Sequence, residues 1–491
     1  MTTEELFQRQ RNFFLSGTTR SFSSRRKALR DLLGVIDARQ DEILNALQTD
    51  LGKAPMEGYL AEVGLVKEEI RFTLRYLKRW MKPERVATPM VHFPAGSRRY
   101  KDPLGVVLIL APWNYPFQLC IAPLAAALAA GNCVMLKPSR LAPAVGRVIE
   151  SIVKEIFPPE LAAVVPPPRD GHSERGADSP RDDNRRDDNR QAYREQTSQK
   201  LWYQEILNLP YDHIFFTGSE RVGKEVMAAA AKHLTPVTLE LGGKSPVLVD
   251  ATADLPLAAR RIVWGKCLNA GQTCVAPDYV LVQRERFCEL VEELKKEIAR
   301  QYGEDPLAGN DLPKIISERH FHRLTDLIEE ERAGEAVLFG GKSDPANRRI
   351  APTLIGPARF DSPAMREELF GPLLPIIPFD DLSTVIEQLC RRPTPLALYL
   401  FTRNKCVERQ VIGQLRFGGG CINDTVVHLA NPRLPFGGVG ASGMGSYHGK
   451  AGFDTFSRVK SVLKKGLWLD LPFRYPPYKE LFFRVVRCIM K

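Results

Sequence analysis

The sequence predicts an α/β fold that contains a Rossmann-type sheet, and three observations support this prediction. Val106 to Leu110 and Cys133 to Leu136 are uniformly apolar runs of strand length. An alanine-rich helical stretch that ends at Gly131 lies between them, and a second helical pattern runs from Ala142 to Phe157. Apolar strands that alternate with helices indicate a parallel sheet covered by helices on both faces. The 491 residues exceed what one hydrophobic core normally serves, so we expect two or three domains.

The composition is that of a globular protein and argues against several functional classes. Hydrophobic residues make up 44% and charged residues 26% of the chain. The formal net charge is +11, but Lys and Arg are scattered along the chain, so we expect no nucleic-acid binding. Nine cysteines without regular spacing predict neither a disulfide framework nor a metal site. The N-terminus lacks the segments of a signal peptide, so we expect a cytoplasmic protein.

The first ninety residues read mainly as helices. From Ser24 to about Pro83, apolar residues recur at the i, i+3, i+4, i+7 spacing of an amphipathic helix. We expect these helices to be structural and assign them no chemistry. The segment Val91 to Tyr100 then predicts a β-hairpin with its turn at Ala95-Gly96.

Cys274 is a candidate nucleophile. It lies among small and polar residues between Asn269 and Asp278, a composition that predicts an exposed turn entering a helix, where a thiolate is stabilised. A lone cysteine is more often a small buried residue, and Cys267 fits that description. The segment around Cys274 alone does not distinguish these two possibilities, so a catalytic role requires matching groups from other segments.

Two further segments supply those parts. Glu240 is the single carboxylate of an apolar, β-prone run that ends at a Gly-Gly pair, and such surroundings raise the pKa of a carboxyl group toward that of a general base. Asn114 follows the apolar strand that begins at Val106 and offers an amide donor. A nucleophile, a base and an amide donor are the three parts of an acyl-transfer site.

In their order and spacing these segments resemble the aldehyde dehydrogenase superfamily, in register from about Phe13 to about Pro477. The ending Gly443 to Lys450 and the short N-terminus resemble the class 3 branch, the fatty and aromatic aldehyde dehydrogenases. Four further motifs contribute to the resemblance: Leu136 to Ser139, Phe216 to Ser219, Glu367 to Pro372 and Pro435 to Gly445.

The resemblance implies an enzyme that oxidises medium- or long-chain aliphatic or aromatic aldehydes to carboxylic acids. NAD or NADP would be the cofactor, and the reaction would pass through a thiohemiacetal and a thioester on Cys274. It also implies a homodimer, to which the hairpin and a strand from Phe453 to Val462 contribute.

The resemblance places the cofactor phosphates at an unusual motif, because no GxGxxG follows the first strand. A strand that ends at Phe216 gives way through Gly218 to a helix, whose free N–H groups suit a pyrophosphate. Ordinary strand-to-helix turns have the same composition. In the family the position belongs to the cofactor, which assigns Gly218, Ser219 and Gly223 to it.

Four more cofactor residues follow from the resemblance. Lys137 matches the residue that grips the adenosine ribose, Glu368 the ligand of the nicotinamide ribose, and Phe370 its packing partner. From composition alone, Glu368 and Phe370 would be a turn with surface charge. The family commonly has Glu where this chain has Arg140, and a guanidinium can pair with a 2′-phosphate that a carboxylate would repel. We predict dual or NADP-leaning specificity.

The segment 166–200 departs from the family pattern. It contains a tandem Arg-Asp-Asp-Asn-Arg repeat and almost no apolar residues, which predicts a disordered, solvated loop. It is either a genuine insertion or a stretch read out of frame from the gene. The predicted division is into N-terminal helices that pack on the cofactor domain (1–90), an NAD(P)-binding domain with an oligomerisation hairpin near 91–104 (91–240), a catalytic domain (241–426), a return to the cofactor domain with the oligomerisation strand (427–465), and a C-terminal tail (466–491).

Several alternatives remain open at this stage. As a helix, the tail gathers Arg484 and Arg487 on one side and apolar residues such as Phe482 on the other, so it either docks on the body or rests on an anionic membrane surface. One alternative function is a dehydrogenase that passes the acyl group to coenzyme A. Another is a non-enzymatic scaffold that keeps only the fold.

Overall fold

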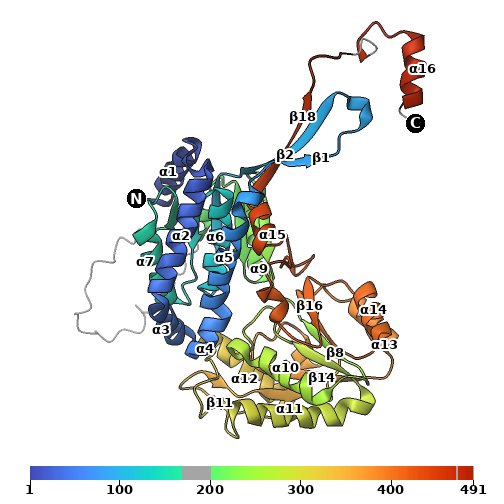
Figure 1. Ribbon diagram of the computed structural model, residues 1–491. Helices are drawn as coiled ribbons and strands as arrows, with labels where there is room; N and C mark the ends of the chain where they lie inside the picture. Colours follow the sequence, from blue (N-terminus) through green and yellow to red (C-terminus); the bar gives the residue numbers. More distant parts are fainter. Residues whose placement is uncertain (168–200, 471–473, 490–491) are drawn as a thin grey trace, which may run out of the picture.

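The computed structural model describes residues 1–167, 201–470 and 474–489, which form two large sheets flanked by helices and a projecting arm (Figure 1). All but the first two residues of the predicted loop 166–200 lie outside the described residues.

The first sheet has the predicted parallel arrangement. Its six strands follow the order β17-β7-β6-β3-β4-β5, and only β17 runs antiparallel to its neighbour. From the central strand β3 the chain passes to β4 on one side, whereas the later strand β6 lies on the other side of β3. The order in which strands are added therefore reverses at β3. The strands are β3 (Val106–Leu110), β4 (Cys133–Lys137), β5 (Ala162–Val164), β6 (His213–Thr217), β7 (Val237–Glu240) and β17 (Gly443–Met444).

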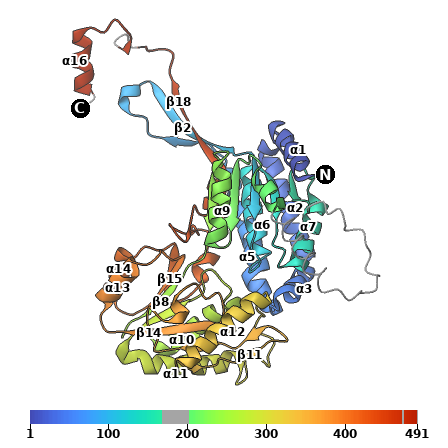
Figure 2. The same ribbon diagram turned by 180° about the vertical axis from the view of Figure 1, so that it is seen from behind.

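Strand β3 is apolar at every position because both faces of the sheet are covered. Val107 and Ile109 join a core with helices α2, α5 and α6, whereas Val106, Leu108 and Leu110 join a second core with α1 and α9. Figures 1 and 2 show these two sets of helices on opposite faces. The predicted doubly covered sheet is therefore confirmed. The helices are α1 (Thr3–Leu15), α2 (Phe22–Ala38), α5 (Gly64–Trp80), α6 (Gln118–Ala130), α7 (Pro143–Ile156) and α9 (Glu220–Ala231).

Between α2 and α5 the chain forms one regular helix, α3, and then a short, irregular helical segment. Helix α3 (Gln40–Leu51) packs on α7, and α4 (Pro55–Gly58) continues directly into a π-helical turn, Tyr59–Val63, before α5 begins. A π turn inserts one extra residue per turn and changes which side chains share a face.

The second sheet is also largely parallel. Its order is β10-β13-β14-β9-β8-β15-β16, with only β10 antiparallel. Helix α12 starts at Glu318, because Ser317 caps its first turn. The strands are β8 (Pro246–Val249), β9 (Tyr279–Gln283), β10 (Val337–Phe339), β13 (Thr353–Ile355), β14 (Leu373–Phe379), β15 (Ala397–Phe401) and β16 (Gly419–Ile422). The main helices are α10 (Leu255–Cys267), α11 (Phe287–Tyr302), α12 (Glu318–Ala333), α13 (Leu382–Cys390) and α14 (Lys405–Gln414).

The carboxyl edge of the first sheet faces the amino edge of the second. Glu240 ends β7, and β8 begins only six residues later at Pro246. The N–H of Asp278, just before β9, donates to the carbonyl of Ser245, just before β8. Loops from both sheets therefore meet at this junction, which is where ligands bind in open α/β sheets.

The projecting arm corrects two sequence predictions. Ala95-Gly96 is not a turn: it begins the long strand β2 (Ala95–Pro103), which pairs with β1 (Glu84–Val86) and β18 (Ser457–Lys465). The predicted strand from Phe453 starts in helix α15 (Gly449–Thr455), because Gly452 and Phe453 pack against the body instead.

The C-terminal helix α16 (Glu480–Ile489) forms as predicted but does not dock on the body. Figures 1 and 2 both show it beyond the arm, away from the two sheets. Among the described residues, no helix is both long and apolar enough to cross a membrane.

Candidate active site

Cys274 lies in a tight loop between α10 and β9. Upstream of it, Asn269 and Ala270 have left-handed backbone angles, with φ of 53° and 52°. Such angles are strained in residues other than glycine and cluster at functional sites. The prediction that this turn enters a helix is wrong: the helix comes before it, and the turn leads into β9.

Hydrogen bonds hold this loop on both sides of the cysteine. Before it, the amide of Gln272 donates to the carbonyls of Asn269 and Lys314, each at 3.0 Å. After it, the hydroxyl of Tyr399 donates to the carbonyl of Val275 at 2.6 Å. All these bonds are at least partly buried, so the backbone on both sides of Cys274 is firmly held.

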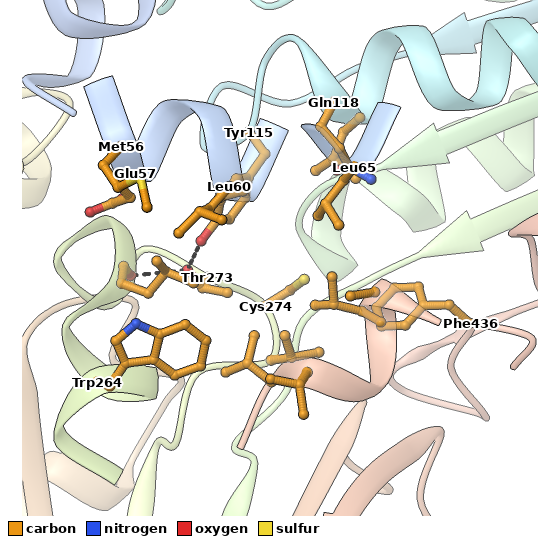
Figure 3. Close-up of a pocket in the computed structure, with 18 of the residues that line it drawn as sticks. Met56, Glu57, Leu60, Leu65, Tyr115, Gln118, Trp264, Thr273, Cys274 and Phe436 are labelled. Carbon is orange, nitrogen blue, oxygen red and sulfur yellow. Dashed lines mark hydrogen bonds between the residues drawn. The ribbon is translucent and has the colours of Figure 1, made fainter. Parts of the chain in front are cut away.

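The sulfur of Cys274 lines a pocket of about 440 Å³ with mainly apolar walls. Figure 3 shows Cys274 between Thr273 and Phe436, with Leu60 above and Trp264 below, and marks the bond between Tyr115 and Thr273. The thiol is thus reachable from the pocket.

Burial raises the pKa of Cys274 to about 12, and the carboxylates of Glu368 and Glu240 add to this effect. The backbone N–H groups of Cys274 and Val275 act in the opposite direction but are weaker. The prediction of a stabilised thiolate is therefore wrong. Burial without a nearby cation disfavours the thiolate.

Asn114 is brought to the same loop. Its side-chain Nδ2 donates to the carbonyl of Gln272 at 3.1 Å, across 158 residues of sequence, and the residue is buried. An amide nitrogen carries two hydrogens. One hydrogen anchors Asn114 to the cysteine loop, and the second can serve an oxygen of a ligand.

Glu240 ends β7 with its carboxylate buried. The residue is 2% exposed, and neither carboxylate oxygen has a hydrogen-bond partner among the described residues. Burial raises the pKa of Glu240 well above its usual value. Charges on Glu240 and Cys274 both influence the buried Tyr447, so these three groups share one region. The structure thus brings Cys274, Glu240 and Asn114 together.

The predicted phosphate motif forms the β6–α9 turn. Ser219 caps α9, its hydroxyl accepting from the N–H of Val222 at 3.5 Å. Gly218 and Gly223 permit close packing: an added Cβ would lie 2.6 Å from the Phe216 ring and 2.8 Å from a methyl of Leu241, respectively. Gly223 therefore lets α9 approach the sheet rather than facing a ligand.

Lys137 and Arg140 lie at the carboxyl end of β4. The pKa of Lys137 is lowered to about 8 by burial and by the nearby guanidinium of Arg140. Its ammonium lies 5.5 and 5.3 Å from the ring centres of Trp202 and Tyr203. Neither cation forms an ion pair with a carboxylate of the described residues, and such a pair of cations suits an anionic group.

Glu368 and Phe370 come from the second sheet's side of the junction. Burial raises the pKa of Glu368 to about 8, and Asp278 contributes. Phe370 has a left-handed φ of 49° and packs edge-on against Trp113 at 5.4 Å. A cavity of about 370 Å³ contains both Glu368 and Ser219.

These features fit a dinucleotide. The hydroxyl of Thr217, beside the α9 turn, is buried without a partner among the described residues. A partnerless hydroxyl next to a helix N-terminus is what a phosphate-bearing ligand would satisfy.

Sequence reasoning missed the residues that hold the loops. Asn269, Gln272 and Tyr115 carry no motif recognisable by periodicity, and their partners lie far away in the chain. Asn269 and Gln272 lie within the segment from Asn269 to Asp278 around Cys274. Their polarity in a buried stretch was the available signal.

Comparisons with known proteins identify relatives of this chain. The aldehyde dehydrogenase family model matches residues 4–181 and 204–462. The chain is 44% identical to a 4,4'-diaponeurosporen-aldehyde dehydrogenase of Staphylococcus aureus, covering 98% of this chain and 97% of that one. It is 42% identical to a dimeric NADP-preferring aldehyde dehydrogenase of Rattus norvegicus, covering 96% of each. The solved structure of Staphylococcus aureus AldH in a substrate-bound state superposes with a TM-score of 0.90 at 43% identity, covering 99% of each chain.

Proposed function

The chain belongs to the aldehyde dehydrogenase family, and from this premise we propose that Cys274, Glu240 and Asn114 are its catalytic residues. The enzyme oxidises aldehydes to carboxylic acids with NAD or NADP. The main support for these catalytic roles is the arrangement of Cys274 and Asn114. The sulfur of Cys274 lines an apolar pocket, and the carbonyl of Gln272 on the same loop holds the amide of Asn114.

The first step is addition of the Cys274 sulfur to the aldehyde carbon. A C–S bond forms, the carbonyl electron pair moves to oxygen, and the thiol proton leaves. Glu240 suits the proton acceptor because burial has raised its pKa. The free N–H of Asn114 and the backbone N–H of Cys274 donate to the oxyanion, and one such donor typically lowers the barrier by about 3 to 4 kcal/mol.

The chemistry that NAD or NADP supplies when bound is acceptance of a hydride from the former aldehyde carbon. The α9 turn with Ser219 would hold the pyrophosphate, Lys137 the adenosine ribose, and Glu368 with Phe370 the nicotinamide ribose.

The second half of the reaction is hydrolysis of the thioester on Cys274. Glu240 removes a proton from water, the water oxygen attacks the thioester carbonyl, and the C–S bond breaks. The sulfur leaves and a carboxylic acid forms. Glu240 has no competing partner among the described residues, so its carboxylate is free for this role.

The pocket supports medium- or long-chain aliphatic or aromatic aldehydes as substrates. Leu60, Leu65, Trp264 and Phe436 line it, and such walls favour apolar chains through burial. The Staphylococcus aureus relative is itself named for an aldehyde, 4,4'-diaponeurosporen-aldehyde.

The decisive test is Cys274→Ala. We expect this variant to lose aldehyde oxidation and to keep binding of NADP, because the sulfur forms the covalent intermediate but holds no cofactor phosphate. Production of reduced cofactor from a medium-chain aldehyde, read by absorbance, measures the first property, and equilibrium binding of NADP measures the second. Retained oxidation in this variant would remove Cys274 as the nucleophile.

Arg140 supports use of NADP, as the relative from Rattus norvegicus prefers it. The guanidinium is exposed beside Lys137 and can pair with a 2′-phosphate. Arg140→Glu should raise KM for NADP about tenfold or more and change KM for NAD little, a tenfold change being about 1.4 kcal/mol. Equal changes for both cofactors in steady-state kinetics would contradict this role.

Assembly and location belong to the same proposal. Strand β18 of the arm has one edge that no other described strand pairs with, and a relative is named dimeric, which supports a homodimer. A cytoplasmic location, a membrane contact through α16 and the predicted domain limits stay predictions.

A further inference from the structure

The N-terminal helices contribute a buried charged network to the active-site loops, although the sequence led us to assign them no chemistry. Lys53 follows α3, and Glu62 lies in the π turn before α5. Both side chains are 0% exposed, and the Lys53 ammonium lies 2.5 Å from a carboxylate oxygen of Glu62.

Lys53 reaches the backbone of the proposed oxyanion donor. Its ammonium donates to the carbonyl of Asn114 at 2.8 Å and lies 4.0 Å from the ring centre of Tyr115. The same carbonyl of Asn114 also accepts from the side chain of Asn269 at 2.8 Å. Two donors thus fix the peptide unit of Asn114.

Glu62 fixes the other end of the same loop. Its second carboxylate oxygen accepts the N–H groups of Phe117 and Gln118, at 2.9 and 3.2 Å, where α6 begins. A carboxylate at a helix N-terminus is stabilised by the free N–H groups and the helix dipole. The loop from Asn114 to Gln118 is therefore held at both ends by one ion pair.

The same helical segment also grips the cysteine loop. Glu57, in α4, accepts the N–H of Asn269 at 2.9 Å, at the strained start of that loop. In a regular α-helix, side chains five residues apart diverge by about 140°. The π turn at Tyr59–Val63 changes this geometry, and Glu57 and Glu62 each reach an active-site loop.

We propose that Lys53 and Glu62 are positioning residues, which set the orientation of the Asn114 amide relative to the Cys274 sulfur. This inference rests on the proposed function. A buried ion pair contributes little net stability compared with apolar residues of the same volume, because desolvation offsets the attraction. Here the pair's remaining hydrogen bonds all go to the loop that carries Asn114, so its effect is on geometry.

The test is the double variant Lys53→Met/Glu62→Gln, which removes both charges and nearly conserves volume. We expect kcat for aldehyde oxidation to fall about 10-fold to 100-fold, the scale of a misplaced catalytic group, with little change in KM. Lys67→Met is the matched control: it removes another largely buried lysine, which pairs with Asp37 at 2.6 Å, and should lower the melting temperature while leaving kcat unchanged.

A double-mutant cycle separates positioning from general stability. If the pair acts through Asn114, adding Lys53→Met/Glu62→Gln to Asn114→Ala should cause no further loss of kcat. If the fold-losses of kcat in Asn114→Ala and in the double variant multiply when the substitutions are combined, the inference is overturned. If Asn114→Ala alone leaves kcat unchanged, the proposed oxyanion role fails instead, so the two failures are distinguishable.

A milder variant guards against failure to fold. Glu62→Asp keeps the negative charge beside Lys53, but its shorter side chain cannot span both Lys53 and the N–H groups of Phe117 and Gln118. We expect its kcat to lie between that of the wild type and that of the double variant. When Glu62→Asp is combined with Asn114→Ala, kcat should fall no further than in Asn114→Ala alone. A kcat of Glu62→Asp equal to that of the wild type would count against Glu62 as an anchor.

Discussion

At the scale of single residues, burial decides the chemistry of the site. Glu240 and Cys274 are both held in surroundings that favour their neutral forms, and their pKa values are raised for this reason. A carboxyl group in this state holds its proton at a pH where an exposed one would have lost it, and once ionised it is a stronger base. The cost is that less of it is ionised at low pH.

This gives a pH dependence with a definite sign. Glu240 works as a base only when ionised, so kcat should rise with pH through its raised pKa, by up to about tenfold per unit below that pKa. Glu240→Gln should remove this dependence and lower kcat, because both the deprotonation of Cys274 and the hydrolysis of the thioester lose their base; steady-state production of reduced cofactor across pH measures both effects. Unchanged steady-state turnover in Glu240→Gln would eliminate it as the base.

At the scale of elements, the β6–α9 unit shows how packing prepares a binding site. Helix α9 starts directly at the carboxyl edge of the sheet, and Ser219 caps it. Gly223 lets the helix lie close to Leu241, which keeps the first N–H groups at the junction of the two sheets. The position of the helix, more than any single side chain, defines the proposed pyrophosphate site.

Enlarging Gly223 should therefore impair cofactor binding. In Gly223→Val the new side chain meets Leu241 and pushes α9 outward, so KM for NADP should rise about tenfold, equivalent to about 1.4 kcal/mol. Gly413→Val is the control, because that helical glycine in α14 has no atom within 4 Å of an added Cβ. Comparable KM values for both variants would show that α9 can shift without consequence.

At the scale of the whole molecule, the arm is the feature that suggests a second chain, because its sheet has an open edge. Strand β18 pairs with β2 along nine residues, and within the described part of the chain no strand lies beside its other edge. Val459 and Leu463, two of its apolar side chains, are 43% and 46% exposed. An open edge with exposed apolar residues is suited to pairing with a second chain.

Charging this strand should dissociate the proposed dimer. Val459→Lys/Leu463→Lys places two positive charges on one face of β18, where burial in an interface would be costly. Light scattering after gel filtration should show the mass of one chain of 55.2 kDa in place of two. Lys464→Gln, on the opposite face of the strand, should leave the mass unchanged, and an intact dimer in the lysine variant would place the interface elsewhere.

The sequence by itself determined the fold class, several strands and helices of the first sheet, and the proposed catalytic residues Cys274, Glu240 and Asn114 as candidates. Those features depend on local periodicity and on short motifs, such as the run Val106–Leu110 and the segment around Cys274. Only the tertiary structure decided which residues hold Asn114, because Lys53 and Gln272 lie 61 and 158 residues away from it in the chain. It also decided the raised pKa of Cys274, since burial depends on what packs around a residue and not on its neighbours in sequence.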